Sequence, residues 1–320
     1  MSDWKDRNQE HFDATASEYD QHNRADEMTT KGANAIAAEF KAVNPNHQEA
    51  RAFEFGIGTG LVAVKLAPSV KSILGVDISE EMLKQVQKKI EDPANAAVAS
   101  KIQTVQHLVT DEAPLPEALL KDNVVSAGGQ GFDLVYTNMV MHHVENAPKV
   151  IQSIVQHFVK KESGWFFMVD IQYVKGISEI WHKLVRELFH APKEGEGEGH
   201  HHHHHHHHHG HGHDHGHAHA HGHEHGKEHG DGHHGHHHHH HQHHHHHHEE
   251  GEGATKGKRH EVADIVPYSS GFKDDDLRQW FTEAGLVDIV VKTGFTMEFF
   301  VPSMNKEVSF QYVIAGGRRA

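Results

Sequence analysis

The stretch Arg51-Ala-Phe-Glu-Phe-Gly-Ile-Gly-Thr-Gly60 constrains the fold of this chain more than any other. It begins as a short apolar strand and runs into three glycines at alternate positions, Gly56, Gly58 and Gly60. The apolar segment 61–67 that follows has the length of a short helix. A strand, a glycine turn and a helix in this order open a nucleotide-binding βαβ unit. Glycines serve there because they let the backbone turn sharply and bring bare peptide groups against a ligand.

The spacing of these glycines indicates which nucleotide is bound. The dinucleotide motif G-x-G-x-x-G places its third glycine three positions after the second, whereas Gly60 follows Gly58 by two. Glu54 precedes the set and is expected at the carboxyl end of the strand, where open α/β sheets bind ligands. The pattern E-x-G-x-G-x-G resembles motif I of the class I S-adenosylmethionine-dependent methyltransferases. The alternative is a glycine-rich turn that binds no ligand.

A second acid follows at the end of the next predicted strand, 72–77. The carboxylate of Asp77 is placed to accept both hydroxyls of a ribose. Ser79 is a good N-cap for the helix that follows, and two glutamates in its first turn favour the helix dipole. The run D-I-S-E-E-M-L resembles the segment after motif I in the same family, which implies that Asp77 and Ile78 contact the cofactor. A capping or turn aspartate is the alternative.

Two further strands are expected at 101–109 and 131–138. Asp111 follows the first of them, and the resemblance implies that it lies beside the adenine amino group, with Glu112 as the second choice. An acid in a solvated loop is the alternative. The second strand starts with F-D-L-V and leads to a pair of histidines, which resembles motif IV of the family and implies that Asn138 lines the cofactor pocket.

Three residues are candidates for a general base, His142, His143 and Tyr19. Histidine titrates near neutral pH, but paired histidines at this position in the family are often structural. Segment 11–20 resembles the F-D-x-x-A-x-x-Y-D sequence that precedes motif I in small-molecule methyltransferases of the ubiquinone- and menaquinone-biosynthesis type. That lead-in often folds over the cofactor. A helix packed on the sheet edge is the alternative.

The resemblance implies an α/β fold, a Rossmann-like seven-stranded sheet of order 3-2-1-4-5-7-6 with strand 7 antiparallel and helices on both faces. The closing segments F-T-E-A-G-L and Y-V-I-A-G-G-R resemble the C-terminal hairpin of the family. Periodicity and breakers predict the remaining elements. The helices are expected at 29–43, 148–161, 176–190 and 274–284, and the strands at 164–170, 286–293 and 308–315.

Composition changes abruptly in the region 193–259, which contains 33 of the 43 histidines, all between His200 and His248. Such a segment cannot bury a core, so we predict a disordered insertion in one methyltransferase domain made of 1–192 and 260–320. Neutral imidazole binds Zn, Ni and Cu, which makes the tract a nonspecific metal binder. A tolerated repeat expansion is the alternative to a metal function.

Charge and cysteine content exclude several classes of protein. The net charge of −15 and the absence of a long Lys/Arg stripe argue against nucleic-acid binding. The chain has no cysteine, hence no disulfide and no thiolate site, which suits the cytosol or nucleus. Its first residues are charged and do not resemble a signal peptide, and no apolar run approaches the roughly 18 residues that a membrane span needs.

These observations favour an S-adenosylmethionine-dependent methyltransferase that acts on a small molecule by direct SN2 displacement. Two other functions stay open, a metal-buffering protein that works through the histidine tract and a protein methyltransferase. Thr137-Asn-Met-Val140 stands where amide-methylating enzymes carry N-P-P-Y, and no double-glutamate loop typical of arginine methyltransferases is present. An NAD-dependent reductase would need a different glycine spacing and a Tyr-x-x-x-Lys motif. Neither the acceptor nor the oligomeric state can be predicted from the sequence.

Overall fold

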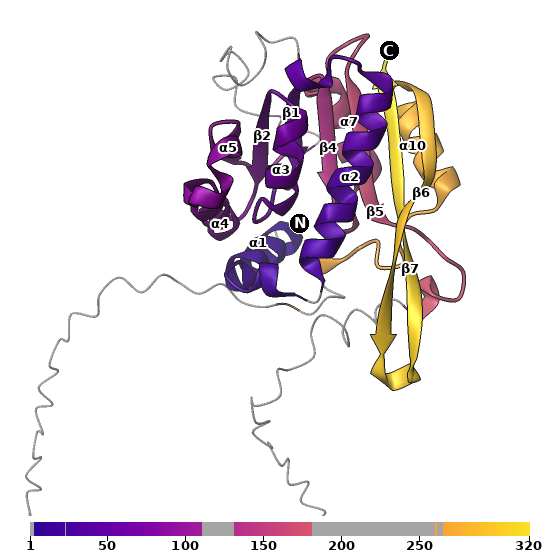
Figure 1. Ribbon diagram of the computed structural model, residues 1–320. Helices are drawn as coiled ribbons and strands as arrows, with labels where there is room; N and C mark the ends of the chain where they lie inside the picture. The colour runs from indigo at the N-terminus through magenta and orange to yellow at the C-terminus, as the bar shows by residue number, and fades with distance from the viewer. Residues whose placement is uncertain (1–2, 23, 111–130, 181–259, 261–264) are drawn as a thin grey trace, which may run out of the picture. The chain divides into compact units, whose positions relative to one another are not determined.

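Seven strands form a single sheet in the computed structural model, which describes residues 3–22, 24–110, 131–180, 260 and 265–320 (Figure 1). The strand order is β3-β2-β1-β4-β5-β7-β6, and β7 runs antiparallel to both of its neighbours. This confirms the predicted fold class. The strands are β1 (Arg51–Phe55), β2 (Ser72–Asp77), β3 (Ile102–Gln106), β4 (Leu134–Asn138), β5 (Trp165–Ile171), β6 (Leu286–Val301) and β7 (Lys306–Arg319).

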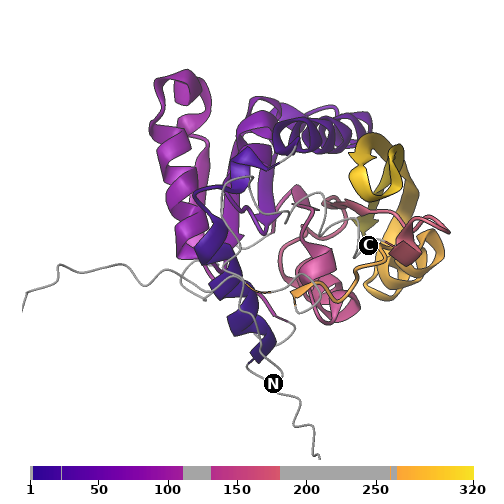
Figure 2. The ribbon, with the colours of Figure 1, turned by 90° about the horizontal axis from the view of Figure 1, so that it is seen from below.

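Helices cover both faces of the sheet, as Figures 1 and 2 show. The helices α2 and α3 pack on one face, and α7 and α10 pack on the other. The α-helices are α1 (Asp3–Thr15), α2 (Ala25–Val43), α3 (Leu61–Leu66), α4 (Glu80–Glu91), α5 (Ala96–Ala99), α7 (Ala147–His157) and α10 (Asp274–Glu283). Two short 3-10 helices also matter for the site, η1 (Tyr19–Gln21) and η5 (Met141–His143).

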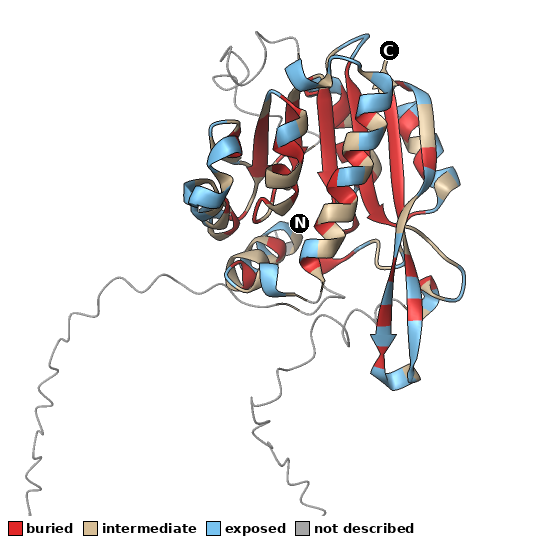
Figure 3. Ribbon diagram, in the orientation of Figure 1, coloured by how far each residue is buried: buried red, intermediate tan, exposed pale blue. Residues whose placement is uncertain are grey.

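The central strands are buried on both faces, which is why they read as apolar runs rather than as alternating patterns (Figure 3). Successive side chains still point to opposite faces. Phe53 packs into the core under α7, where its ring stacks on Phe158 with centroids 4.4 Å apart. Its neighbour Ala52 packs into the core under α2 and α3. The two cores hold β1 between them and so fix the start of the glycine loop.

The parallel strands bring their carboxyl ends to one edge of the sheet. The register places Glu54 of β1 beside Tyr136 of β4 and beside Gly75 of β2. The last residues of β2 and β4 are Asp77 and Asn138. The fold therefore gathers, at one edge, three polar side chains that lie far apart in the sequence.

Strands β6 and β7 are much longer than the predicted segments 286–293 and 308–315. A register irregularity lies between Thr293 and Phe295, next to the glycine at which the predicted strand stops. Beyond it the two strands continue to pair with each other as a hairpin. Alternate apolar residues on this hairpin are buried, and that burial stabilises the extension.

Helix boundaries also differ from the predictions. Helix α2 begins at Ala25, four residues before the predicted start, and α7 ends at His157, four residues before its predicted end. Helix α4 begins as predicted, because Ser79 Oγ accepts a hydrogen bond from the Met82 backbone N–H at 3.0 Å. Of the helix predicted at 176–190, the described residues contain one 3-10 turn, Ser178–Ile180. Residues 181–190 of that segment and the histidine tract lie outside the described residues, so the predicted domain boundaries stay a prediction.

None of the helices in the described ranges is both long enough and apolar enough to cross a membrane.

Candidate functional site

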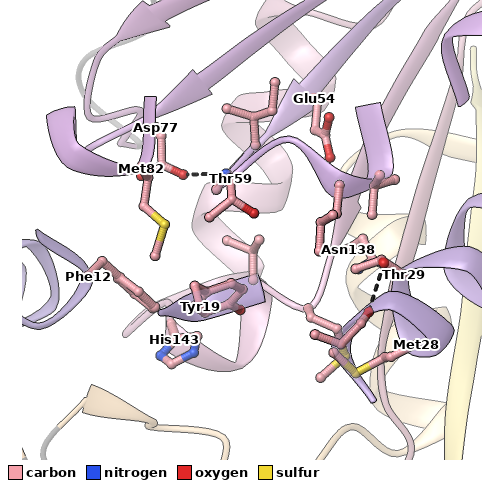
Figure 4. A pocket seen from close by; sticks show the side chains of 18 residues that line it. Phe12, Tyr19, Met28, Thr29, Glu54, Thr59, Asp77, Met82, Asn138 and His143 are labelled. Carbon is pink, nitrogen blue, oxygen red and sulfur yellow. Dashed lines mark hydrogen bonds between the residues drawn. The ribbon is translucent and has the colours of Figure 1, made fainter. Parts of the chain in front are cut away.

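A cleft opens at the carboxyl ends of β1, β2 and β4 (Figure 4). Its walls include Glu54, Asp77 and Asn138 from the strand ends, together with Gly56 and Gly58 from the loop after β1. The cleft therefore lies at the edge of the sheet where open α/β sheets bind their ligands.

The glycine loop adopts backbone conformations that favour glycine. Gly56 and Gly58 have φ angles of +72° and +54°. A Cβ at Gly56 would lie 2.6 Å from Cγ2 of Val140, whereas one at Gly58 would meet no atom within 4 Å and would enter open space. The bare backbone at Gly58 is thus available to a ligand. Gly60, the residue just before α3, is not among the residues that line the cleft. It packs against Val86 of α4.

Asp77 ties this loop to the end of β2. Its Oδ2 accepts a hydrogen bond from the Gly58 N–H at 2.8 Å, and its Oδ1 accepts one from the Ser79 N–H at 3.0 Å. Burial raises the pKa of Asp77, and the backbone donors oppose the shift. Its neighbour Ile78 does not line the cleft, and the Ile78 carbonyl accepts a hydrogen bond from Gln106. Asp77 therefore shapes the loop and presents a carboxylate beside it.

Glu54 is the most deeply buried acid of the cleft, at 2% exposed. The hydroxyl of Tyr136 donates a hydrogen bond to its Oε2 at 2.9 Å. Burial raises the pKa of Glu54 to about 8, the Tyr136 hydrogen bond opposes the shift, and the charge of Asp77 adds to it. Without a ligand, the carboxyl group is therefore mostly protonated at neutral pH.

Asn138 lines the cleft and is 9% exposed. Its Oδ1 is buried and has no hydrogen-bond partner among the described residues. A Cβ on Gly32 of α2 would lie 2.2 Å from that oxygen, so the amide packs closely against the helix backbone. The next residue, Met139, has a positive φ of 59° and turns the chain along the cleft wall. The structure thus places Asn138 in the lining of the cleft, with an amide oxygen that no described residue satisfies, which is a recurrent feature of functional sites.

The N-terminal segment lies over the cleft and contributes Phe12 and Tyr19 to its lining (Figure 4). Polar contacts attach it to the loops below. Asp13 accepts a hydrogen bond from Ser79 Oγ at 2.6 Å, and Asp20 accepts one from Thr59 Oγ1 at 2.5 Å. Asp20 also forms an ion pair with Lys89. These contacts join two short segments of the N-terminal region to the glycine loop and to α4.

The paired histidines have different surroundings. His143 lines the cleft, and its ring meets Phe12 edge-to-face at 5.0 Å. Its Nδ1 lies 3.0 Å from the Ile265 carbonyl, which can only accept, so Nδ1 carries the hydrogen and Nε2 is the basic atom of the neutral ring. His142 does not line the cleft, and its Nδ1 lies 2.7 Å from Oδ1 of the fully buried Asp170. Of the two, His143 is the one placed to meet a bound acceptor.

Tyr19 is in the cleft but is a poor base. Burial, with the charges of Asp77, Asp20 and Asp170, raises the pKa of its phenol to about 12. The hydroxyl thus keeps its proton at neutral pH and can serve as a hydrogen-bond donor. Asp111 and its second choice Glu112 lie outside the described residues.

Sequence reasoning missed the groups that hold the site together. Tyr136, Thr59 and Asp170 all come from recognised segments, but their partners are 28 or more residues away. Asp170 carried a usable signal, because an acid at the end of a buried strand is rare without a partner. Tyr136 carried none, since a tyrosine in an apolar strand is ordinary.

The residues present fit S-adenosylmethionine. Two carboxylates and an amide oxygen face a cleft whose described lining contains no Lys or Arg. Such a lining favours a cationic ligand with hydroxyl donors over a phosphate.

A comparison with protein families agrees with this description. A family model described as a methyltransferase domain matches residues 21–297. The YcgJ protein from Bacillus subtilis is 12% identical with a TM-score of 0.48, over 90% of this chain and 99% of that chain. A Thermotoga maritima protein described as a possible histamine N-methyltransferase is 12% identical with a TM-score of 0.48, over 97% and 98%. The CcbJ methyltransferase from Streptomyces caelestis is 19% identical with a TM-score of 0.37, over 51% and 57%. A search of curated sequences finds no match.

Proposed function

The chain belongs to the methyltransferase-domain family, as a class I enzyme that uses S-adenosylmethionine, and we propose that it methylates a small molecule bound beside His143. The observation that supports this most strongly is the pair of carboxylates at neighbouring strand ends, Glu54 and Asp77, on either side of a glycine loop that leaves open space. That arrangement suits the two polar ends of the cofactor, its ammonium group and its ribose.

In the proposed arrangement each polar group at the strand ends has one role. Asp77 accepts the ribose hydroxyls, Glu54 meets the ammonium group, and the backbone at Gly56 and Gly58 lets the ligand approach the sheet. Asn138 supplies a carbonyl oxygen that has no hydrogen-bond partner in the described part of the chain. Asp111, which the resemblance places at the adenine, remains part of the proposal on sequence grounds.

The acceptor side is proposed at the other end of the cleft. Phe12, Met28 and Met139 supply apolar side chains to the lining, and His143 supplies a polar one (Figure 4). An apolar wall with one polar group suits a small molecule that carries a hydroxyl, amine or acidic carbon. The N-terminal segment covers this region, which favours a small acceptor over an extended protein chain.

When bound, the cofactor supplies an electrophilic methyl group on its sulfonium. The protein positions the two reactants and accepts the proton that the acceptor loses. The cleft aligns the two reactants and excludes water, which accounts for most of the rate of such transfers. His143 Nε2 takes the proton that the acceptor loses, and the Ile265 carbonyl keeps the imidazole in the tautomer that can do so. Tyr19 orients the acceptor by donating a hydrogen bond.

Calorimetric titration with S-adenosylmethionine tests the cofactor site, using the full chain, a variant that lacks 200–248, and Asp77→Ala. We expect micromolar binding to the first two and loss of binding in the third. The matched control is Asp92→Ala, which removes an exposed capping carboxylate outside the cleft and should bind normally. Binding that persists in Asp77→Ala would contradict the placement of the ribose.

A transfer assay then separates the acceptor classes. Labelled methyl groups from S-adenosylmethionine, incubated with a cell extract, should appear in the low-molecular-mass fraction. Label confined to protein would replace the proposal by a protein methyltransferase. His143→Gln should lower kcat with little change in KM for the cofactor.

A metal-binding function is the second candidate, because 33 histidines lie within 200–248. The described part of the chain contains no group of three or more His, Asp or Glu side chains that could hold a metal ion. Ni or Zn uptake by the full chain alone, with no cofactor binding to either form, would make this the leading function.

A further inference from the structure

Glu54 is a carboxyl group in an unusual position for a cation-binding acid. It is 2% exposed, and its one hydrogen bond from a described residue comes from the phenol of Tyr136. Tyr136 is itself fully buried, at 0% exposed. The pair lies side by side on neighbouring parallel strands, where the register matches Glu54 with Tyr136. Both strands are held between two hydrophobic cores, so the phenol of Tyr136 has a fixed position. Its hydrogen bond therefore fixes the position of the Glu54 carboxyl group.

The charges around Glu54 do not neutralise it. From β2 the facing group is Asp77, whose charge disfavours a second anion. From β4 it is Tyr136, which donates a hydrogen bond without a charge. On the side of α2 and α3, Lys65 contacts the cleft-lining Thr29 and is paired with Asp26 at 2.8 Å. Within the described part of the chain, the charged group that acts on Glu54 is therefore an acid, Asp77, and no ion pair neutralises the carboxylate.

We propose that Glu54 carries a proton in the free enzyme and releases it to solvent when the cofactor's ammonium group binds, and that Tyr136 is the positioning residue for the resulting carboxylate. This inference rests on the proposed placement of the cofactor. The proton of the uncharged form lies on Oε1, because Oε2 accepts the hydrogen bond of Tyr136. On binding, the O–H bond of Glu54 breaks, the proton leaves to buffer, and an ion pair forms with the ligand.

The proposal also distinguishes ligands by charge. A ligand with an ammonium group stabilises the ionised carboxylate, whereas a nucleoside without one leaves Glu54 uncharged. Between pH 6 and pH 8 the affinity for the charged ligand should rise about 50-fold, because the pKa of Glu54 is about 8 in the free enzyme. Above that range the ligand's own amino group begins to lose its proton, so the measurement stays below about pH 8.

The test measures binding of S-adenosylhomocysteine to the full-length enzyme by calorimetry, in two buffers of different ionisation enthalpy. We expect about 0.9 proton to be released per ligand at about pH 7, since roughly nine-tenths of Glu54 is protonated there. 5′-Methylthioadenosine, which has the nucleoside but no ammonium group, should release none and bind with no pH dependence. Glu54→Gln should release none with either ligand.

Tyr136→Phe tests the positioning role while preserving the packing of the ring. Loss of a hydrogen bond to a charged group should weaken S-adenosylhomocysteine about tenfold and raise the proton release at about pH 7.5 from about 0.8 to nearly one proton per ligand. Binding of 5′-methylthioadenosine should be unchanged. A merely structural role would weaken both ligands equally and leave the proton release as in the wild type, which would overturn the assignment of Tyr136.

Two outcomes separate this inference from the proposed function. If S-adenosylhomocysteine binds the wild type without proton release and with a flat pH profile, the inference alone is overturned. If the wild type binds neither ligand, the proposed cofactor site is wrong and the inference is wrong with it.

Discussion

The cleft has a floor and a roof that are built in different ways. The floor consists of the carboxyl ends of β1, β2 and β4 with the glycine loop, and the roof consists of residues 3–22. The floor lies between two hydrophobic cores and has few exposed atoms. The roof is attached by side-chain contacts such as Asp13 to Ser79 and Asp20 to Thr59. Both regions line the same ligand space.

Because of this difference, the floor should contribute most to the stability of the fold, whereas the roof should control access to the cleft. A buried aromatic side chain such as Phe53 contributes about 3 to 5 kcal/mol, judged by truncation to alanine. An exposed ion pair or polar contact contributes about 0 to 1 kcal/mol. The floor should therefore keep its geometry through cycles of binding, whereas the roof, in which Asn8, His11, Thr15 and Ala16 are also buried, should detach at a smaller cost than unfolding of the floor. A cofactor that lies under Phe12 and Tyr19 requires such a roof, because it must enter and leave.

The most damaging change to the floor should be Gly56→Ala. At a φ of +72° an alanine is strained by about 1 to 2 kcal/mol. Its Cβ would also lie 2.6 Å from Val140, which must move within the cleft wall. We expect a loss of about 2 to 5 kcal/mol in the free energy of unfolding, measured with urea, and at least about a 100-fold loss of S-adenosylhomocysteine affinity.

Gly285→Ala is the matched control for this substitution. Its φ is +85°, but a Cβ there would meet no atom within 4 Å. It should cost about 1 kcal/mol of stability and leave binding unchanged. Equal effects of the two substitutions would show that backbone strain alone, and not the contact with Val140, determines the behaviour of the floor.

The floor is the region that the sequence predicted well. Its elements are continuous in the chain, and each carries a local signal, such as the alternate glycines from Gly56 or the N-cap at Ser79. Strand order followed from the resemblance. Gly60 and Ile78, which were expected at the cofactor, are not among the residues that line the cleft: Gly60 packs on Val86, and the Ile78 carbonyl accepts a hydrogen bond from Gln106. Their contact with a bound cofactor stays a prediction.

A second test of the floor is Glu54→Gln, which should stabilise the free protein. The pKa of Glu54 is about 8 in the folded state and near 4.5 in the unfolded chain. As pH rises from about 4.5 to 8 the unfolded chain loses this proton while the folded protein retains it, so the free energy of unfolding falls. Glutamine keeps the Tyr136 hydrogen bond and cannot ionise. We expect a gain of about 1 to 3 kcal/mol at about pH 7 and none at about pH 4 in urea unfolding.

The control for this prediction is Glu91→Gln on the exposed face of α4, which should change neither stability nor its pH dependence. A Glu54→Gln variant less stable than the wild type at about pH 8 would show that Glu54 is ionised in the free protein. The floor would then carry a permanent charge, and the contrast with the polar roof would be smaller than we infer.

The side-chain contacts that attach the roof and those within the floor could not have been predicted from the sequence. Asp20 and Thr59, which join roof and floor, are 39 residues apart, and Glu54 and Tyr136, which join two strands of the floor, are 82 apart. Each pair depends on which segments the folded chain brings together, and no sequence pattern links its two residues. The long β6–β7 hairpin was missed for a related reason, since its strands pair with each other past Gly294, where local propensity predicts an end.

The smallest expected effect concerns the roof, in Asp20→Asn. The amide keeps one acceptor for Thr59 but loses the ion pair with Lys89, so the free energy of unfolding should change by less than about 1 kcal/mol. Because the roof closes over bound ligand, its weaker attachment should increase the S-adenosylhomocysteine dissociation rate about three- to tenfold and speed proteolysis within residues 3–22. Glu49→Gln, which breaks an exposed pair with Lys71 away from the cleft, should do neither. If Asp20→Asn instead destabilises the whole protein as strongly as Gly56→Ala, roof and floor unfold as one unit and the distinction between them is wrong.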